Sequence, residues 1–250
     1  MKEPGEFIAG KVPDDMIGEI KYSIFEDQKQ LICHSLWKPN TEVSIHPPHE
    51  FLGYLDSLFT GDGSGGENHI IYAQQVHGNK VLAAGSAGQY PDCDGLITGT
   101  SHLKLIIRTA DCAAVMLYHP AKKVIANLHV GWRGAQQKII QQGIQLLMQE
   151  WRVQPSELLA AVSPFIQACC FEVGGEFHDY FEAQLLIKRK DKMYFDLQRC
   201  IREQLIRAGI QEERMEISPI CTRCNPLELP SFRRDKTQNR LINMIEIKGD

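Results

Sequence analysis

Residues 104–130 read KLIIRTADCAAVMLYHPAKKVIANLHV and contain three short apolar runs, KLIIRTA, AAVMLY and KVIANLHV. Each run is rich in β-branched and other apolar side chains, and short polar segments separate the runs, which is typical of buried strands joined by turns. NHIIYAQQV, at residues 68–76, has the same character. This part of the chain therefore predicts neighbouring strands of a buried sheet.

Helical patterns alternate with further strand patterns towards the C-terminus. Residues 135–151 carry apolar side chains at intervals of three to four, which predicts an amphipathic helix. The other expected elements are strands at 158–163, 193–197, 214–220 and 241–248 and helices at 175–186 and 198–210. Because the two kinds of element are interspersed, we expect a mixed α/β protein with helices covering sheet faces.

Length and charge narrow the class of protein. A chain of 250 residues with 43% hydrophobic content can bury one substantial core, so we expect a single domain. The glycine-rich stretch TGDGSGGEN, at residues 60–68, is interpreted as a surface loop. A formal net charge of -4 gives no electrostatic footprint for nucleic acid. The first twenty residues lack the pattern of a signal peptide, and no apolar stretch is long enough to span a membrane, so we expect a cytoplasmic protein.

Three segments combine a strand end with a residue type that binds metals: QQVHGNK at His77, RTADCAA at Cys112 and NLHVGWRGA at His129. Two imidazoles and one thiolate suit zinc, and copper accepts the same ligands. Three protein ligands leave one position open, as in catalytic rather than structural zinc sites.

Spacing alone does not establish this site. The intervals of 35 residues, from His77 to Cys112, and 17 residues, from Cys112 to His129, match no local metal-binding signature. The two histidines can equally be hydrogen-bonded residues at strand ends, with Cys112 a buried thiol. A third interpretation makes Cys112 a nucleophile that His129 activates without any metal.

Arginines near these segments are candidates for binding an anion. Arg133 lies in HVGWRGAQQ, where a glycine-marked turn leads into the helix expected to begin near Ala135, and a helix N-terminus attracts anions. Arg233 and Arg234, in SFRRDK, form a second candidate clamp. The alternative is that the glycines serve only the turn and the arginines are solvated.

In a chain of 250 residues for which we expect no signal peptide, the eight cysteines indicate buried thiols, metal ligands or catalysis more often than a disulfide framework. CTRCNP places Cys221 and Cys224 in one CxxC pair, which supplies only two of the four ligands of a structural zinc. The adjacent Cys169 and Cys170 are expected to bind one tetrahedral ion poorly. We therefore predict that these four residues are core or shell thiols.

Seven motifs occur in an order that resembles one known family. They are QVHG, DCDGLIT, TADC, HVGWRGA, CCFEVG, CTRC and SFRRD. Together they resemble the multicopper polyphenol oxidases, or laccase-domain proteins, whose members are also described as purine nucleoside phosphorylases and as peptidoglycan editing factors. The resemblance runs from His69 to Ile247, so residues 1–250 divide into a divergent N-terminal segment, 1–68, and a family-like core, 69–247, of one domain.

The resemblance implies a layered α/β/β/α sandwich and places the family's metal ligands on His77, Cys112 and His129. It further implies zinc, or copper in an older account, and activity on adenosine, inosine and methylthioadenosine. Adenosine deaminase activity is attached to the family as well. The leading expectation is a zinc-dependent purine nucleoside phosphorylase whose partners are nucleosides and phosphate, with the oligomeric state left open.

Three other functions remain open at this point. A hydrolase that edits peptidoglycan precursors would use Cys112 and His129 as nucleophile and base. A copper-dependent polyphenol oxidase would need many histidines, commonly in HxH pairs, and the chain has nine histidines and no such pair. A non-enzymatic binding protein would need a fourth ligand that closes the metal site.

Overall fold

A hairpin between residues 113 and 130 forms the centre of the fold. Its strands are β8 (Ala113–His119) and β9 (Val124–Val130), which pair antiparallel and are buried along their whole length. The coordinates are a computed structural model that describes residues 17–38, 51–55 and 69–249. Side chains of β8 alternate between two cores, with Ala113, Val115 and Leu117 in one and Ala114, Met116 and Tyr118 in the other. This alternation places β8 between two apolar layers.

The hairpin belongs to the first of two six-stranded sheets. In order, the strands of this sheet are β14 (Met215–Ile217), β10 (Leu159–Val162), β8, β9, β6 (Gly95–Thr98) and β4 (Val81–Ala83). The second sheet has the order β1 (Gly18–Lys21), β2 (Leu31–Trp37), β15 (Leu241–Ile247), β7 (Lys104–Thr109), β3 (Ile70–Ala73) and β5 (Gly88–Tyr90). The two sheets pack against each other through a shared core that includes Leu105, Met116 and Ile245.

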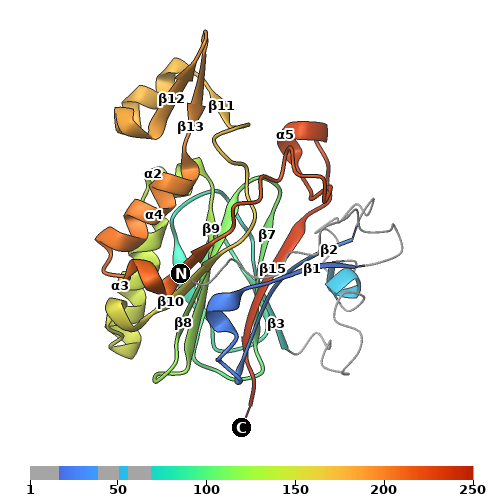
Figure 1. The fold of residues 1–250 in the computed structure, drawn as a ribbon. Coiled ribbons are helices and arrows are strands. Elements are labelled where there is room, and N and C mark those ends of the chain that lie inside the picture. Colours follow the sequence, from blue (N-terminus) through green and yellow to red (C-terminus); the bar gives the residue numbers. More distant parts are fainter. Residues whose placement is uncertain (1–16, 39–50, 56–68, 250) are drawn as a thin grey trace.

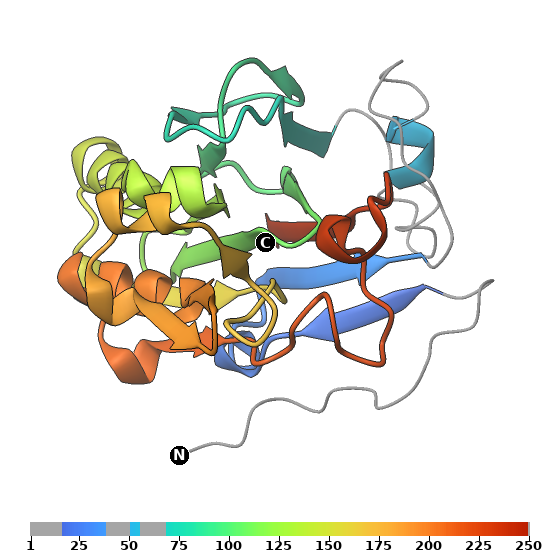
Figure 2. The same ribbon diagram turned by 90° about the horizontal axis from the view of Figure 1, so that it is seen from above.

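Helices cover the outer face of the first sheet. They are α2 (Trp132–Gln136), α3 (Ile139–Trp151) and α4 (Leu197–Arg207), and they lie together on one side of the molecule (Figures 1 and 2). Ile140, Ile144 and Leu147 of α3 share a core with Leu128 of β9. The outer face of the second sheet packs against the helical turn at residues 51–55 through Phe51 and Leu55. The expected mixed α/β fold with α/β/β/α layers is therefore confirmed.

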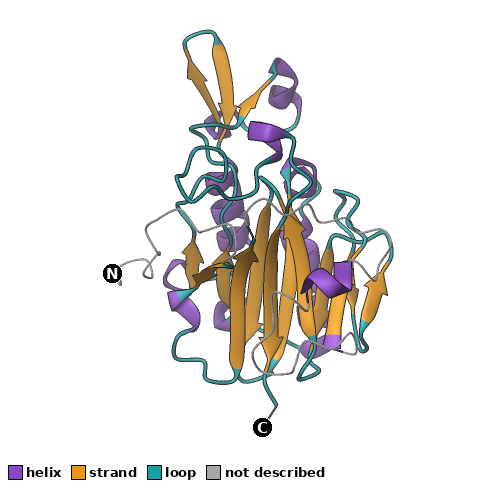
Figure 3. Cartoon of the chain, turned by 90° about the vertical axis from the view of Figure 1, so that its right-hand side faces the viewer, coloured by secondary structure: helices purple, strands orange, loops and turns teal. Residues whose placement is uncertain are grey.

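A small third sheet projects beyond one end of the sandwich (Figure 3). It contains β11 (Glu172–Val173), β13 (Lys192–Phe195) and β12 (Leu186–Arg189). The helix expected at residues 175–186 is wrong, because this stretch forms 3-10 turns at Gly175–Asp179 and Ala183–Leu185 before β12. Phe177, Phe181 and Phe195 pack together there, with ring centroids 4.3 to 5.7 Å apart. These contacts replace the regular face of a helix.

One other expectation needs correction. The helix expected at 135–151 is divided into α2 and α3 by Lys138, whose φ of 61° lies in the left-handed region. The N-terminal segment contributes β1 and β2 to the second sheet. The stretch at 60–68 lies outside the described residues. Among the described residues, no helix is both long and apolar enough to cross a membrane.

A buried amide joins the two sheets. Asn127 of β9 is fully buried, and its Nδ2 donates to the carbonyl oxygens of Leu105 on β7, at 3.0 Å, and of Asn243 on β15, at 2.9 Å. The Asn243 Nδ2 in turn donates to the carbonyl of Ile107 and to the hydroxyl of Thr109. These bonds satisfy polar groups inside an apolar interface and fix how β9 lies against the second sheet.

We predict that Asn127→Ala lowers the free energy of unfolding by roughly 2 to 4 kcal/mol, because it removes two buried hydrogen bonds and leaves a cavity. Urea unfolding followed by circular dichroism measures this loss. Gln89→Ala, on the exposed surface of β5, is the matched control and is expected to change stability by less than about 0.5 kcal/mol. Equal stabilities for the two variants would contradict this role of Asn127.

Candidate metal centre

The fold brings His77, Cys112 and His129 together from three separate segments. His77 lies in the loop after β3, Cys112 between β7 and β8, and His129 near the end of β9. Their ligand atoms all lie within 4.8 Å of one another. The two imidazole rings meet edge to face, with centroids 4.9 Å apart. The structure thus gathers the three residues that the sequence singled out.

Asp94 keeps two of these three residues in place through hydrogen bonds. Its side chain is fully buried, and one carboxylate oxygen lies 2.7 Å from Nδ1 of His129. The same carboxylate accepts hydrogen bonds from the backbone N–H groups of Val76, His77 and Gly78. One side chain therefore fixes both the ring of His129 and the loop that carries His77.

The charges at this site depend on one another. Burial opposes ionisation of Cys112, but His129 and His77 outweigh it and lower the pKa of the thiol to about 6. Burial likewise opposes protonation of His129, but Cys112 and Asp94 raise the pKa of the imidazole to about 9. Without a metal, and at a pH between about 6 and about 9, Cys112 is therefore a thiolate beside the imidazolium of His129.

Gly131 makes room for the cysteine. A Cβ atom added at residue 131 would lie 2.8 Å from Sγ of Cys112 and 3.8 Å from a ring carbon of His77. The first separation is shorter than a carbon–sulfur contact allows. The glycine that follows β9 is thus required by the close approach of the backbone to the thiol.

The three residues open onto a cavity of about 990 Å³. Five cationic side chains line it: Arg108, Arg133, Arg233, Lys236 and Arg240. Aromatic side chains form other parts of the wall: Tyr54, Trp132, Phe171 and Phe232. Among the described residues, Asp111 is the only carboxylate that lines it. A cavity of this composition favours a ligand that combines an anionic group with a flat apolar part.

The arginines expected at the site differ in position. Arg133 stacks on Trp132, with its guanidinium carbon 4.3 Å from the ring centroid, and lines the cavity. Arg233 also lines the cavity, while its Nη1 donates to the carbonyl of Glu172. Arg234 is not part of the lining and instead donates to the carbonyls of Thr222 and Leu229. Only two of the three arginines therefore face the cavity.

Asp111 explains how the arginine segment is positioned. Its carboxylate accepts hydrogen bonds from the hydroxyls of Thr222 and Ser231 and from the backbone N–H of Arg233. Ser231 caps α5 (Phe232–Asp235), the short helix that carries Arg233. Because Asp111 precedes Cys112 in the chain, the same turn that presents the thiol also holds α5 over the cavity.

Sequence reasoning did not identify Asp94, Arg108 or Arg240 as site residues. Asp94 lies in DCDGLIT and Arg108 directly precedes TADC, so two of them belong to or adjoin the recognised motifs. The pKa of the Arg108 guanidinium falls to about 10, because the residue is buried and Arg240 lies nearby. The expected helix N-terminus near Ala135 is also revised, because α2 has only five residues and contributes little dipole.

The donor set fits a zinc-type ion. Zinc binds imidazole nitrogen at about 2.0 to 2.1 Å and thiolate sulfur at about 2.3 Å, which keeps ligand atoms roughly 3.3 to 3.8 Å apart. The three ligand atoms, all within 4.8 Å, need only small side-chain movements to meet this requirement. The bond from Nδ1 of His129 to Asp94 leaves Nε2 available as the ligand atom.

We predict that Cys112 in the metal-free protein reacts with iodoacetamide with a midpoint near pH 6, because its lowered pKa keeps the thiolate present down to that pH. An ordinary cysteine has its midpoint near pH 8.5. Peptide-resolved mass spectrometry over a pH series measures the rate at this residue alone. Asp94→Asn weakens the imidazolium that stabilises the thiolate and is expected to raise the midpoint. A midpoint at the ordinary value in the unmodified chain would refute this account of the charges.

Comparison with known proteins shows which family the chain resembles. Residues 60–248 match the family described as multi-copper polyphenol oxidoreductase laccase. A protein named purine nucleoside phosphorylase from Aquifex aeolicus is 35% identical over 183 residues, which cover 73% of this chain and 84% of that protein. One of the same name from Clostridium acetobutylicum is 30% identical over 183 residues, covering 70% and 76%.

Solved structures share the fold. The crystal structure of YlmD from Geobacillus stearothermophilus superposes with a TM-score of 0.78 at 20% identity, over 88% of this chain and 93% of that one. A Bacillus licheniformis protein, YfiH, gives a TM-score of 0.77 at 21% identity, over 89% and 95%. With three quarters of its length matched, the chain belongs to the multi-copper polyphenol oxidoreductase laccase family.

Proposed function

We propose that this protein is a zinc-dependent purine nucleoside phosphorylase that acts on adenosine, inosine and methylthioadenosine. The observation that carries the proposal is the single cavity lined by His77, Cys112 and His129 together with five cationic and four aromatic side chains. The names of the curated relatives, purine nucleoside phosphorylase, support it independently.

In this proposal His77, Cys112 and His129 are both metal ligands and catalytic residues. Bound zinc supplies a Lewis acid that polarises an oxygen or nitrogen atom of the reactants. Asp94 keeps Nδ1 of His129 engaged, so the ring presents the same nitrogen to the cavity throughout. The lowered pKa of Cys112 provides a thiolate for binding the ion at neutral pH.

Arg133 and Arg233 are proposed to hold phosphate. Both are exposed residues of the cavity wall, so their guanidinium groups are accessible from its open side. A guanidinium fork matches two phosphate oxygens and remains charged at any physiological pH. Arg234 serves the same site indirectly, because its bonds to the carbonyls of Thr222 and Leu229 brace the segment that carries Arg233.

The aromatic wall suits a purine base. Trp132, Phe171 and Phe232 line the same cavity, and each has a cationic side chain over one face of its ring, namely Arg133, Arg233 and Lys236. Stacking on such faces favours planar heterocycles without reading their exocyclic groups. This is consistent with a site that accepts both adenine and hypoxanthine nucleosides.

The proposed reaction exchanges one bond at the anomeric carbon for another. The bond from C1′ to N9 breaks, with its electron pair passing to the base, and a phosphate oxygen forms a new bond to C1′. Positive charge builds on the sugar as the base departs, and a phosphate held beside it stabilises that charge before attacking. The base takes up the proton that the attacking hydrogen phosphate gives up, directly or through water, and the products are free purine and ribose 1-phosphate.

A second candidate function rests on the charge pair of the metal-free site. A thiolate beside an imidazolium is the arrangement used by cysteine hydrolases, and Cys112 and His129 adopt it here when no ion is bound. A peptidoglycan-editing hydrolase would use this pair. A multicopper oxidase is less well supported, because the described residues contain only one histidine-bearing group able to hold a metal.

We predict that the zinc-loaded protein converts inosine to hypoxanthine and ribose 1-phosphate only when phosphate is present, and that Cys112→Ala abolishes this turnover. Loss of the thiolate removes one of three ligands, while circular dichroism is expected to show an intact fold. Asp94→Asn should lower the rate by about 10- to 100-fold, as is typical for partners of a metal-bound histidine. Chromatography of the products measures both effects.

Two outcomes would redirect the assignment. Release of ammonia from adenosine without any dependence on phosphate would make the protein an adenosine deaminase. No turnover of any nucleoside by the zinc-loaded protein would favour the peptidoglycan-editing hydrolase.

We further predict that Arg133→Ala and Arg233→Ala each raise KM for phosphate by about 10- to 100-fold, the loss expected for a charge-assisted hydrogen bond. The KM for inosine should change much less, because the base contacts are retained. Initial rates with each substrate varied in turn separate the two constants. Arg207→Ala, an exposed arginine of α4 paired with Glu203, is the control. An unchanged phosphate KM in both cavity variants would exclude this phosphate site.

A further inference from the structure

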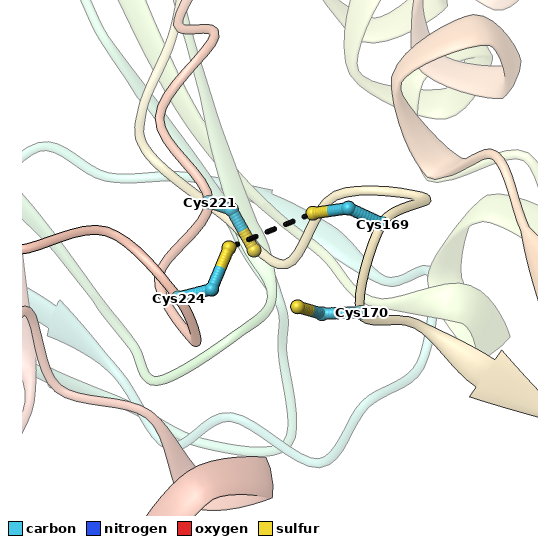
Figure 4. A group of neighbouring side chains, drawn as sticks. All are labelled: Cys169, Cys170, Cys221 and Cys224. Carbon is cyan, nitrogen blue, oxygen red and sulfur yellow. Dashed lines mark hydrogen bonds between the residues drawn. The ribbon is translucent and has the colours of Figure 1, made fainter.

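A second group of metal-binding side chains lies outside the cavity. It consists of Cys169, Cys170, Cys221 and Cys224, which we call the cysteine quartet, and all four sulfur atoms lie within 4.8 Å of one another. Figure 4 shows the four side chains pointing inwards from two loops, one carrying Cys169 and Cys170 and the other carrying Cys221 and Cys224. The sequence alone predicted separate thiols here.

We propose that the cysteine quartet is a structural zinc site with four thiolate ligands. It differs from the His77, Cys112 and His129 set in having four protein donors, so it leaves no position for a substrate. The proposal does not depend on the reaction at the cavity.

The spacing of the sulfurs fits a single tetrahedral ion. Four sulfurs bound to one zinc at about 2.3 Å stand about 3.8 Å from one another. Sγ of Cys169 and Sγ of Cys224 are 3.7 Å apart. A disulfide would require a separation of about 2.05 Å, and all eight cysteines are free. The observed distance, which a hydrogen bond between two thiols also gives, matches one edge of a zinc–sulfur tetrahedron.

The backbone around the quartet is already shaped for binding. The adjacent Cys169 and Cys170 belong to a turn in which the N–H of Cys170 donates to the carbonyl of Gln167. In the second loop, the N–H of Asn225 donates to the carbonyl of Cys221, which closes the turn around the CxxC pair. Turns of this kind let neighbouring cysteines direct both sulfurs to one point, which an extended strand does not.

Hydrogen bonds to sulfur stabilise the charge that a thiolate ligand must carry. The backbone N–H of Gln167 donates to Sγ of Cys221 at 3.5 Å. Such donors are typical of the outer shell of metal-bound thiolates. Cys170 and Cys221 are buried, whereas Cys169 and Cys224 are exposed and give an ion a route in from solvent.

The first of the two loops that zinc would join is also part of the cavity wall, and the second contacts the turn that presents Cys112. Ile166 and Phe171, on either side of the first cysteine pair, line the cavity. Thr222, inside the CxxC pair, donates its hydroxyl to Asp111, the neighbour of Cys112. A parallel bridge between Phe165 and Cys221 already holds the loops side by side. Zinc in the quartet would therefore keep this wall in one arrangement.

The test measures metal content rather than turnover. Purified protein, expressed with zinc and quantified by plasma mass spectrometry, is expected to hold about two zinc ions per chain, one for each ligand set. Cys221→Ser combined with Cys224→Ser should lower this to about one, and Cys112→Ala should also lower it to about one. Cys33→Ser, at a buried cysteine outside both groups, is the control and should keep both ions.

A second measurement avoids any change to the quartet. In Cys112→Ala the remaining zinc should show four sulfur neighbours at about 2.3 Å by X-ray absorption. Nitrogen or oxygen neighbours, absence of metal from this variant, or iron in place of zinc would overturn the proposal. A chain mass about 2 Da lower under non-reducing conditions, the mark of a disulfide between two of these thiols, would overturn it as well.

Discussion

The rest of the site depends on the hydrogen bonds that the carboxylate of Asp94 accepts. It is fully buried, and its partners are Nδ1 of His129 and the three consecutive backbone N–H groups of residues 76–78. These bonds outweigh the burial that would otherwise raise its pKa, so the pKa lies below the ordinary value and the group stays ionised. A buried anion needs such partners, because an unpaired charge in this position would cost several kcal/mol. The site is therefore assembled by folding and not by the ion alone.

The ionised carboxylate also sets the charges further into the site. It favours protonation of His129, and His129 in turn favours the thiolate of Cys112. Burial lowers the pKa of the Arg240 guanidinium in the cavity lining, and the neighbouring Cys112 and Asp111 oppose this fall. The carboxylate and thiolate deep in the site favour a bound cation. The cationic side chains of the cavity lining attract an anion from solvent.

The sequence predicts those parts of the structure that follow from local pattern. Strands β8 and β9 were predictable because buried strands with both faces covered appear as continuous apolar runs. Strands β1 and β2 were missed because LICHSLW mixes polar and apolar residues, and its histidine pairs with Glu19 across the sheet. The stretch at 175–186 has helical periodicity, but its aromatic side chains pack with Phe195 in a way that no local pattern reveals. Asp94 escaped notice for a related reason: its partners are 16 to 35 residues away.

Sequence spacing is a poor guide to both cysteine-containing ligand sets, for opposite reasons. The intervals between His77, Cys112 and His129 match no local signature, and only the resemblance to a family indicated that they converge. The CxxC pair has a recognisable signature, yet its candidate partners, Cys169 and Cys170, are adjacent in sequence, which argues against one shared ion. The turn at residues 168–170 removes that objection, since it lets both sulfurs approach the CxxC loop.

The number of donors then separates the two sets. Three donors facing a cavity leave a position for a reactant, whereas four thiolates close around an ion and can only hold loops in place. With zinc in both sets, as we propose, one ion would serve chemistry and the other would hold loops, and the loop of Cys169 and Cys170 connects the two because its neighbours Ile166 and Phe171 line the cavity.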